Sequence, residues 1–256
     1  SALVSFMDSY RLDSVSVLAA FNIAQAYDGL AVFEDAKYRR NAAIWTQNAY
    51  DRRENLSGDP RLWLEMWHAY YNTKNTDEVL KYCGLLEASE SKSRLFWFDD
   101  GQTYGIFNKQ EKALKMYQKI EDISSDWNED WKNVHFYGIY SFCLNSLKMY
   151  DKEKEILQKG LALFPENDDL LWQKAGHAVS TGDSTYVREK IDNWKRVGRD
   201  AGQPLNVTER NIGFLFEWSG SLKKAEECYR NAIRIDPGYD LGKYSLAYLL
   251  IHHDLN

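Results

Sequence analysis

The residue pair best suited to hold a metal is Glu65 and His68, because the Glu-x-x-His spacing puts both side chains on one helix face. Di-iron helical bundles use this spacing, but they need two such motifs and two further glutamates. The sequence holds one motif, so we interpret both residues as ordinary surface or groove residues. The segment His252-His253-Asp254 is interpreted as a polar helix end rather than an adventitious metal site. We therefore predict no metal and no cofactor.

A phosphate-binding loop is nearly matched by Gly238, Gly242 and Lys243. Such a loop needs four residues between its glycines and a serine or threonine after the lysine, whereas here three intervene and Tyr244 follows. The sequence has no Gly-x-Ser-x-Gly nucleophile elbow. Its carboxylates fall in mixed-sign runs such as residues 151–155, which are typical of a solvated helix face. These observations indicate a protein that is not an enzyme.

The overall composition limits the classes of partner. The 256 residues carry a net charge of −6, and proteins that bind nucleic acid generally are basic, so we expect no nucleic-acid partner. No uninterrupted apolar run approaches the ~18 residues that a membrane helix needs. We interpret the cysteines, Cys83, Cys143 and Cys228, as small buried apolar residues.

One segment is rich in basic residues, which are Lys37, Arg39, Arg40, Arg52 and Arg53. Acidic residues are interspersed among them, at Glu34, Asp35, Asp51 and Glu54. A nucleic-acid surface would need an uncompensated basic stripe. The mixture favours a helix face held by salt bridges.

A repeat of about 34 residues organises the chain. Small residues recur in pairs twelve positions apart, most clearly Ala24 with Ala36, Gly101 with Ala113 and Gly213 with Ala225. Including weaker pairs, the first members lie at residues 24, 67, 101, 141, 175, 213 and 247, and three of the six steps are 34 residues. Sequence periods of this size indicate stacked structural repeats.

Hydrophobic periodicity predicts antiparallel helix pairs. We predict them over residues 17–53, 60–90, 93–124, 130–165, 168–202 and 205–236, with lone helices at roughly 2–13 and 240–254. Gly182 and Gly220 mark predicted turns, Asp59 is a predicted helix cap, and Thr208 or Asn206 is another. No segment alternates as a strand would.

The segment Asn211–Pro237 carries the clearest repeat. Gly213, Ala225, Tyr229, Ala232 and the closing Pro237 follow the tetratricopeptide pattern, so the chain resembles the tetratricopeptide repeat family. The resemblance implies an all-α fold: one domain over residues 1–256, an α-solenoid forming a right-handed superhelix of about six helix pairs. In weaker repeats Trp67 and Glu153 stand where the family prefers small residues, which predicts either splayed helices or a shifted register.

The resemblance also implies a concave binding face lined by the first helix of each pair. Aromatic rings with polar tips suit the recognition of a peptide or a partner surface. The implied peptide-binding residues are Phe21, Gln25, His68, Tyr71, Phe98, Gln102, Phe142, Asn145, Trp172, Arg210, Phe214 and Tyr244.

The leading functional hypothesis is a non-catalytic scaffold that binds a protein or peptide partner along this face. An alternative is a sensor or regulatory domain of a larger bacterial signalling or transcription-regulating protein, since the chain begins with Ser1 inside an amphipathic stretch and we expect it to be part of a longer protein. A helical-repeat enzyme is a third hypothesis. The apolar faces of the end helices could pair two copies into a homodimer.

Overall fold

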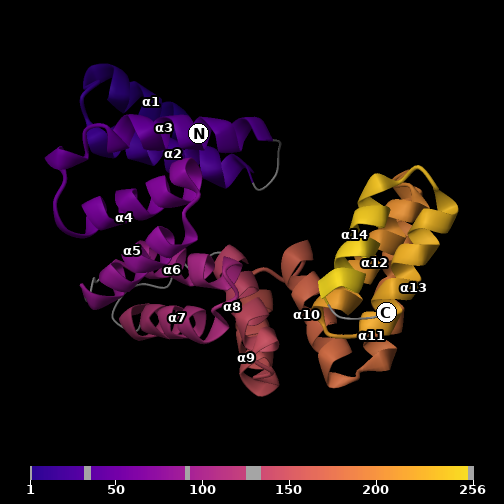
Figure 1. The fold of residues 1–256 in the computed structure, drawn as a ribbon. Coiled ribbons are helices and arrows are strands. Elements are labelled where there is room, and N and C mark those ends of the chain that lie inside the picture. Colours follow the sequence, from indigo (N-terminus) through magenta and orange to yellow (C-terminus); the bar gives the residue numbers. More distant parts are fainter. Residues whose placement is uncertain (1, 32–35, 90–92, 125–133, 253–256) are drawn as a thin grey trace. The chain divides into compact units, whose positions relative to one another are not determined.

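The computed structural model describes residues 2–31, 36–89, 93–124 and 134–252. Within these residues short turns join one helix to the next, and no β-strand occurs (Figure 1). The predicted all-α fold built from helix pairs is therefore confirmed.

The chain divides into two compact units, described separately below. Unit 1 consists of Ser1–Asn108 and Gln118–Ile123, and unit 2 consists of Lys109–Tyr117 and Ser124–Asn256. Helix α7 (Gln110–Ser124) contributes to both. That residues 1–256 act as one domain stays a prediction.

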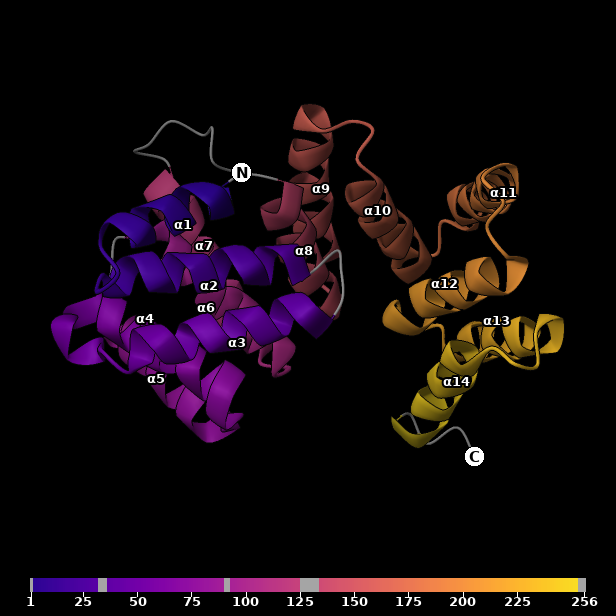
Figure 2. The ribbon, with the colours of Figure 1, turned by 90° about the horizontal axis from the view of Figure 1, so that it is seen from above.

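Unit 1 follows the predicted order of a lone helix and then helix pairs. Its elements are α1 (Ala2–Leu12), α2 (Val17–Ala31), α3 (Ala36–Tyr50), the 3-10 turn η1 (Arg53–Asn55), α4 (Gly58–His68), the π-helical turn η2 (Ala69–Thr73), α5 (Thr76–Ala88) and α6 (Arg94–Ile106). Figures 1 and 2 show α2 and α3 side by side, as the contacts between them require.

Aromatic rings fill the core of unit 1. The ring of Phe21 packs edge-on against two indole rings, with centroid distances of 5.1 Å to Trp63 and 5.6 Å to Trp67. The ring centroids of Trp63 and Phe96 are 4.7 Å apart. Edge-to-face pairs of this kind add to the stabilisation that burial gives. Trp67 is buried, and the ring of Tyr71 also packs against it, with the ring centroids 5.3 Å apart.

Two consecutive carboxyls lie beneath this aromatic core, on α6. Asp99 accepts hydrogen bonds from the indole Nε1 atoms of Trp63, at 2.8 Å, and Trp67, at 3.3 Å. Burial raises the pKa of Asp99 to about 7, and burial together with Asp99 raises the pKa of Asp100 to about 8. Both acids are therefore easier to bury protonated than charged.

Unit 2 repeats the helix pair more regularly. Its helices are α8 (Val134–Ser146), α9 (Tyr150–Leu163), α10 (Asp168–Thr181), α11 (Ser184–Asp200), α12 (Leu205–Trp218), α13 (Leu222–Ile235) and α14 (Asp240–His252). The predicted turns are confirmed at Gly182 and Gly220, whose φ angles of +82° and +75° lie in the left-handed region that glycine adopts without strain.

The small residues of the repeat allow the helices of each pair to approach closely. A Cβ atom on Gly213 would stand 2.6 Å from Cε1 of Tyr229, and both Ala225 and Tyr229 are fully buried. The pairing of Gly213 with Ala225 in the sequence therefore marks the real contact between α12 and α13.

The predicted helix caps are wrong. Helix α4 begins at Gly58 and α12 begins at Leu205, so Asp59, Asn206 and Thr208 all lie inside helices. Asn206 instead donates a hydrogen bond to Asp236, 3.2 Å away on the chain that follows α13.

Candidate binding surfaces

The predicted residues Arg210, Phe214 and Tyr244 come together on α12 and α14. The side chains of Phe214 and Tyr244 are 47% and 66% exposed. Nε of Arg210 donates to Oγ of Ser245 at 3.2 Å, which ties α12 to α14, and the guanidinium lies 5.8 Å from the Phe214 ring centroid. Tyr248 extends the row, with its ring 6.2 Å from that of Tyr244. We call Arg210, Phe214, Tyr244 and Tyr248 the aromatic surface.

Three other predicted binding residues of unit 2 are engaged within the unit. Phe142 stacks on Trp218 at 5.3 Å with the planes 11° apart, and Trp172 packs against Trp194 at 4.8 Å. Asn145 is buried and donates from Nδ2 to both carboxylate oxygens of Glu153, at 3.0 Å each. These residues hold neighbouring helices together.

Glu153 is the centre of a buried polar cluster that the sequence did not predict. Its carboxyl is fully buried and accepts hydrogen bonds from Asn145, from Ser141 Oγ at 3.4 Å and from His177 Nδ1 at 2.8 Å. Burial raises the pKa of Glu153, while the bonds to His177 and Asn145 act in the opposite direction. The residue is buried, at a position where the repeat family prefers a small residue.

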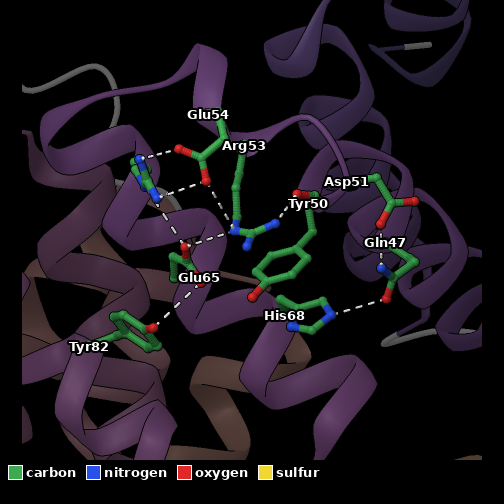
Figure 3. A network of polar contacts seen from close by, with 9 residues as sticks. Gln47, Tyr50, Asp51, Arg53, Glu54, Glu65, His68 and Tyr82 are labelled. Atoms are coloured by element: carbon green, nitrogen blue, oxygen red, sulfur yellow. Dashed lines mark hydrogen bonds and ion pairs between the residues drawn. The ribbon is translucent and has the colours of Figure 1, made fainter.

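In unit 1, Glu65 and His68 belong to a network between α3, η1, α4 and α5 (Figure 3). His68 stacks on Tyr50 with ring centroids 3.6 Å apart and contacts Oε1 of Gln47 at 3.0 Å. Glu65 instead pairs with Arg53 at 3.3 Å and accepts from the Tyr82 hydroxyl at 3.4 Å.

The two residues of the Glu-x-x-His motif therefore have different principal partners. Burial lowers the pKa of His68 and raises that of Tyr50. In the described part of the chain, no group of three or more His, Cys, Asp or Glu residues could hold a metal ion. Figure 3 shows instead how polar side chains join successive helices.

The remaining predicted residues of unit 1 lie at different depths. Phe21 is 1% exposed and belongs to the core, so the surface proposed below does not include it. Gln25, Phe98 and Gln102 are half-buried. Tyr71 is also half-buried, and its hydroxyl donates to the carboxylate of Asp28.

Several hollows lie within the units. In unit 2, one of 710 Å³ lies between α9, α10 and α11, and another of 520 Å³ is lined by α10, α11, α12 and α13. In unit 1, a hollow of 410 Å³ lies where α2, α3 and η2 meet. Sequence reasoning did not predict any of these three, because each is formed by residues from more than one helix.

The architecture defines an all-α helical-repeat protein. Residues 211–239, which contain the Gly213–Tyr229 contact, match the model of the tetratricopeptide repeat family. The match shows one tetratricopeptide repeat in this part of the chain.

Solved structures share the fold. The apo form of RapI is 14% identical, with 93% of this chain and 72% of that chain covered, at a TM-score of 0.58. A tetratricopeptide repeat protein from Parabacteroides merdae ATCC 43184 is 13% identical, with 97% and 91% covered, at a TM-score of 0.54. No curated protein matches the sequence. Among the described residues, no helix is long and apolar enough to cross a membrane.

Proposed function

We propose that this chain is a non-catalytic, protein-binding scaffold, and that a peptide segment of its partner docks on the aromatic surface of α12 and α14. The supporting observation is that Phe214, Tyr244 and Tyr248 are all about half exposed or more, although burial of such rings is strongly favourable. The fold supports a scaffold role, because stacked helix pairs present extended surfaces to partners.

The chemistry of the surface indicates the kind of segment that it binds. The exposed rings offer apolar faces together with tyrosine hydroxyls, a combination enriched at the centres of protein interfaces. Arg210 is held in place by Ser245 and Asn211, so its guanidinium is already ordered beside the Phe214 ring. We therefore expect a segment with apolar anchors and a carboxylate that approaches Arg210.

The test is selection of binding peptides from a random peptide library, followed by titration against variants. Replacing all three of Phe214, Tyr244 and Tyr248 with alanine should lower the affinity for the selected peptides about tenfold or more. Truncation of an anchor that a partner buries costs about 1–2 kcal/mol or more of binding free energy. The melting temperature should change little, since these side chains are exposed.

The matched control is Leu163→Ala, which removes an exposed apolar side chain from α9 of the same unit. It should leave peptide affinity unchanged. Peptides that bind the triple variant as tightly as the parent protein would contradict the proposal, as would a library from which no peptide is enriched.

A triple replacement of Phe142, Trp172 and Phe214 is a poorer test. Phe142 and Trp172 each stack on another tryptophan within unit 2, so their loss would damage packing as well as binding. The regulatory alternative would place the aromatic surface in a longer signalling protein, and the complete reading frame distinguishes it from a free-standing scaffold.

A further inference from the structure

The hollow of 410 Å³ in unit 1 is lined mainly by charged and tyrosine side chains. They come from the end of α2, the start of α3 and the π-helical turn η2, and are Asp28, Arg39, Arg40, Tyr70, Tyr71 and Lys74. Arg39, Arg40 and Lys74 are exposed, so the hollow opens to solvent. It shares no residue with the aromatic surface of unit 2.

An unusual backbone brings three of these residues to one hollow. The turn Ala69–Thr73 is π-helical, and it ends at Lys74, whose φ of +53° puts a non-glycine residue in the left-handed region. Single π-helical turns occur often at functional sites, and a left-handed residue of this type costs free energy that the surroundings must offset. Asn72 fixes the turn by donating to the carbonyl oxygen of Ala43 on α3, at 3.1 Å. Tyr70, Tyr71 and Lys74 line the hollow as a result.

The charges at this hollow do not balance. Among the described residues that line it, three cations meet one carboxylate, Asp28, in a chain whose net charge is −6. In the part of the chain that the structure describes, the side chains of Arg39, Arg40 and Lys74 form no ion pair. The predicted salt-bridged face is found at Arg53, which pairs with Glu65 and Glu54. Glu34 and Asp35, the acidic residues that the prediction placed near Arg39 and Arg40, lie outside the described residues.

One further contact favours an anion at this hollow. Burial and Asp28 raise the pKa of Tyr71, so its hydroxyl stays protonated and donates to Asp28. This bond occupies the carboxylate that, among the described lining residues, accompanies the cations.

We propose that the hollow binds a phosphate monoester dianion. Arginine guanidinium groups present paired donors that match phosphate oxygens, and Lys74 adds a third positive charge. The volume exceeds what a lone phosphate fills, so the group to which the phosphate is attached also enters, against the half-exposed ring of Tyr70. The site is independent of the peptide surface proposed above.

The probes are phenyl phosphate, inorganic phosphate and benzoate, titrated by calorimetry into the intact chain at low ionic strength. Phenyl phosphate should bind at least about fivefold more tightly than benzoate, because a dianion gains more from three cations than a monoanion does. The affinity should fall as salt is added. Benzoate binding as tightly as phenyl phosphate would overturn the proposal. If inorganic phosphate binds as tightly as phenyl phosphate, the part of the proposal that concerns the attached group is overturned.

Charge variants test the site from both directions. Replacing both Arg39 and Arg40 with glutamine should lower the affinity for phenyl phosphate about tenfold or more. Asp28→Asn should raise this affinity severalfold, because it removes the opposing charge. The control is Lys37→Gln, which removes a charge from the same helix turn but lies outside the hollow. If Lys37→Gln loses as much affinity for phenyl phosphate as the arginine variant does, the proposal is overturned. Binding would then depend on the positive potential of the whole region and not on this hollow. Unchanged or weaker binding by Asp28→Asn would also overturn it.

Lys74→Gly separates loss of binding from loss of folding. Glycine adopts the left-handed conformation without strain, so the variant should melt at a temperature equal to or above that of the parent. It should nevertheless bind phenyl phosphate severalfold more weakly, because a charge is lost. Unchanged affinity in Lys74→Gly would contradict the assignment of Lys74 to the site.

Discussion

The two units solve the same packing problem differently. In unit 2 the last complete repeat, α12 and α13, is regular: Gly213 and Ala225 leave room for Tyr229, and the helices approach closely. In unit 1 the corresponding position of the second helix pair holds Trp67, and other rings surround it. A helical repeat can therefore keep its inward register with a bulky residue, provided that specific partners replace the close approach of two backbones.

One of the weaker repeats, in unit 2, shows a third solution. Glu153 occupies an inward position and is satisfied by Ser141, Asn145 and His177. Buried carboxylates are costly unless they are hydrogen-bonded, so this cluster must form as a set.

Gly213→Val should have the largest effect. Its Cβ atom alone would overlap Tyr229, so α12 and α13 must separate, and we expect a loss of about 3–5 kcal/mol in the free energy of unfolding. Chemical denaturation measures the loss. The control is Gly138→Ala in α8, where an added Cβ has nothing within 4 Å and should be tolerated or slightly stabilising. If both variants lose the same free energy of unfolding, helix propensity explains the loss and the close approach of α12 and α13 does not.

Glu153→Ala should cost about 2–4 kcal/mol, because it leaves the side chains of Asn145 and His177 without their buried acceptor. The control is Glu155→Ala, an exposed position on the same helix, with an expected effect within about 0.5 kcal/mol. A double-mutant cycle with His177→Ala should show a coupling of about 1–2 kcal/mol. Additive losses would contradict a cooperative cluster.

Asp100→Asn should have a smaller effect that depends on pH. In the folded protein Asp100 keeps its proton up to about pH 8, whereas an unfolded aspartate loses it near pH 4, so the folded state binds more protons in between. The raised pKa of Asp100 should therefore make the free energy of unfolding of the parent protein fall as pH rises from about 4 to 8.

The amide introduced by Asp100→Asn cannot ionise, so the variant should be more stable than the parent at pH 8, by roughly 1–2 kcal/mol, and should gain least near pH 4. Denaturation at both pH values, followed by tryptophan fluorescence, measures the difference. A gain that is the same at pH 4 and pH 8 would show that ionisation of Asp100 is not the cause.

The sequence predicted the helix pairs well and the binding residues only in part. Apolar periodicity and the Gly213–Ala225 spacing place the helices, because each helix must bury one face. The same pattern puts Phe21, Asn145 and Phe214 on the first helix of their pairs. It cannot tell that Trp63 and Trp67 cover Phe21 or that Glu153 engages Asn145, because those neighbours come from other helices. Phe214 stays 47% exposed, with the Arg210 guanidinium 5.8 Å from its ring centroid.

The hollow of unit 1 was hidden for a different reason. The π-helical turn at Ala69–Thr73 and the left-handed Lys74 carry no sequence signature, so Tyr70 and Lys74 could not be joined to Arg39 and Arg40 in advance. The basic residues were visible in the sequence, but which of them pair with carboxylates depends on the fold.

The association of two copies through the end helices stays a prediction. Helix α1 has no buried residue, and Leu12 and Ile251 are among the most exposed apolar side chains described. Sedimentation velocity over a range of concentrations would test it.

Hydrogen exchange of the intact chain with a selected peptide tests the central claim most directly. If the aromatic surface is the docking site, the peptide should slow exchange in α12 and α14 and leave α2, α3 and α4 unchanged. Protection confined to the helices of unit 1, with α12 and α14 unaffected, would contradict the account.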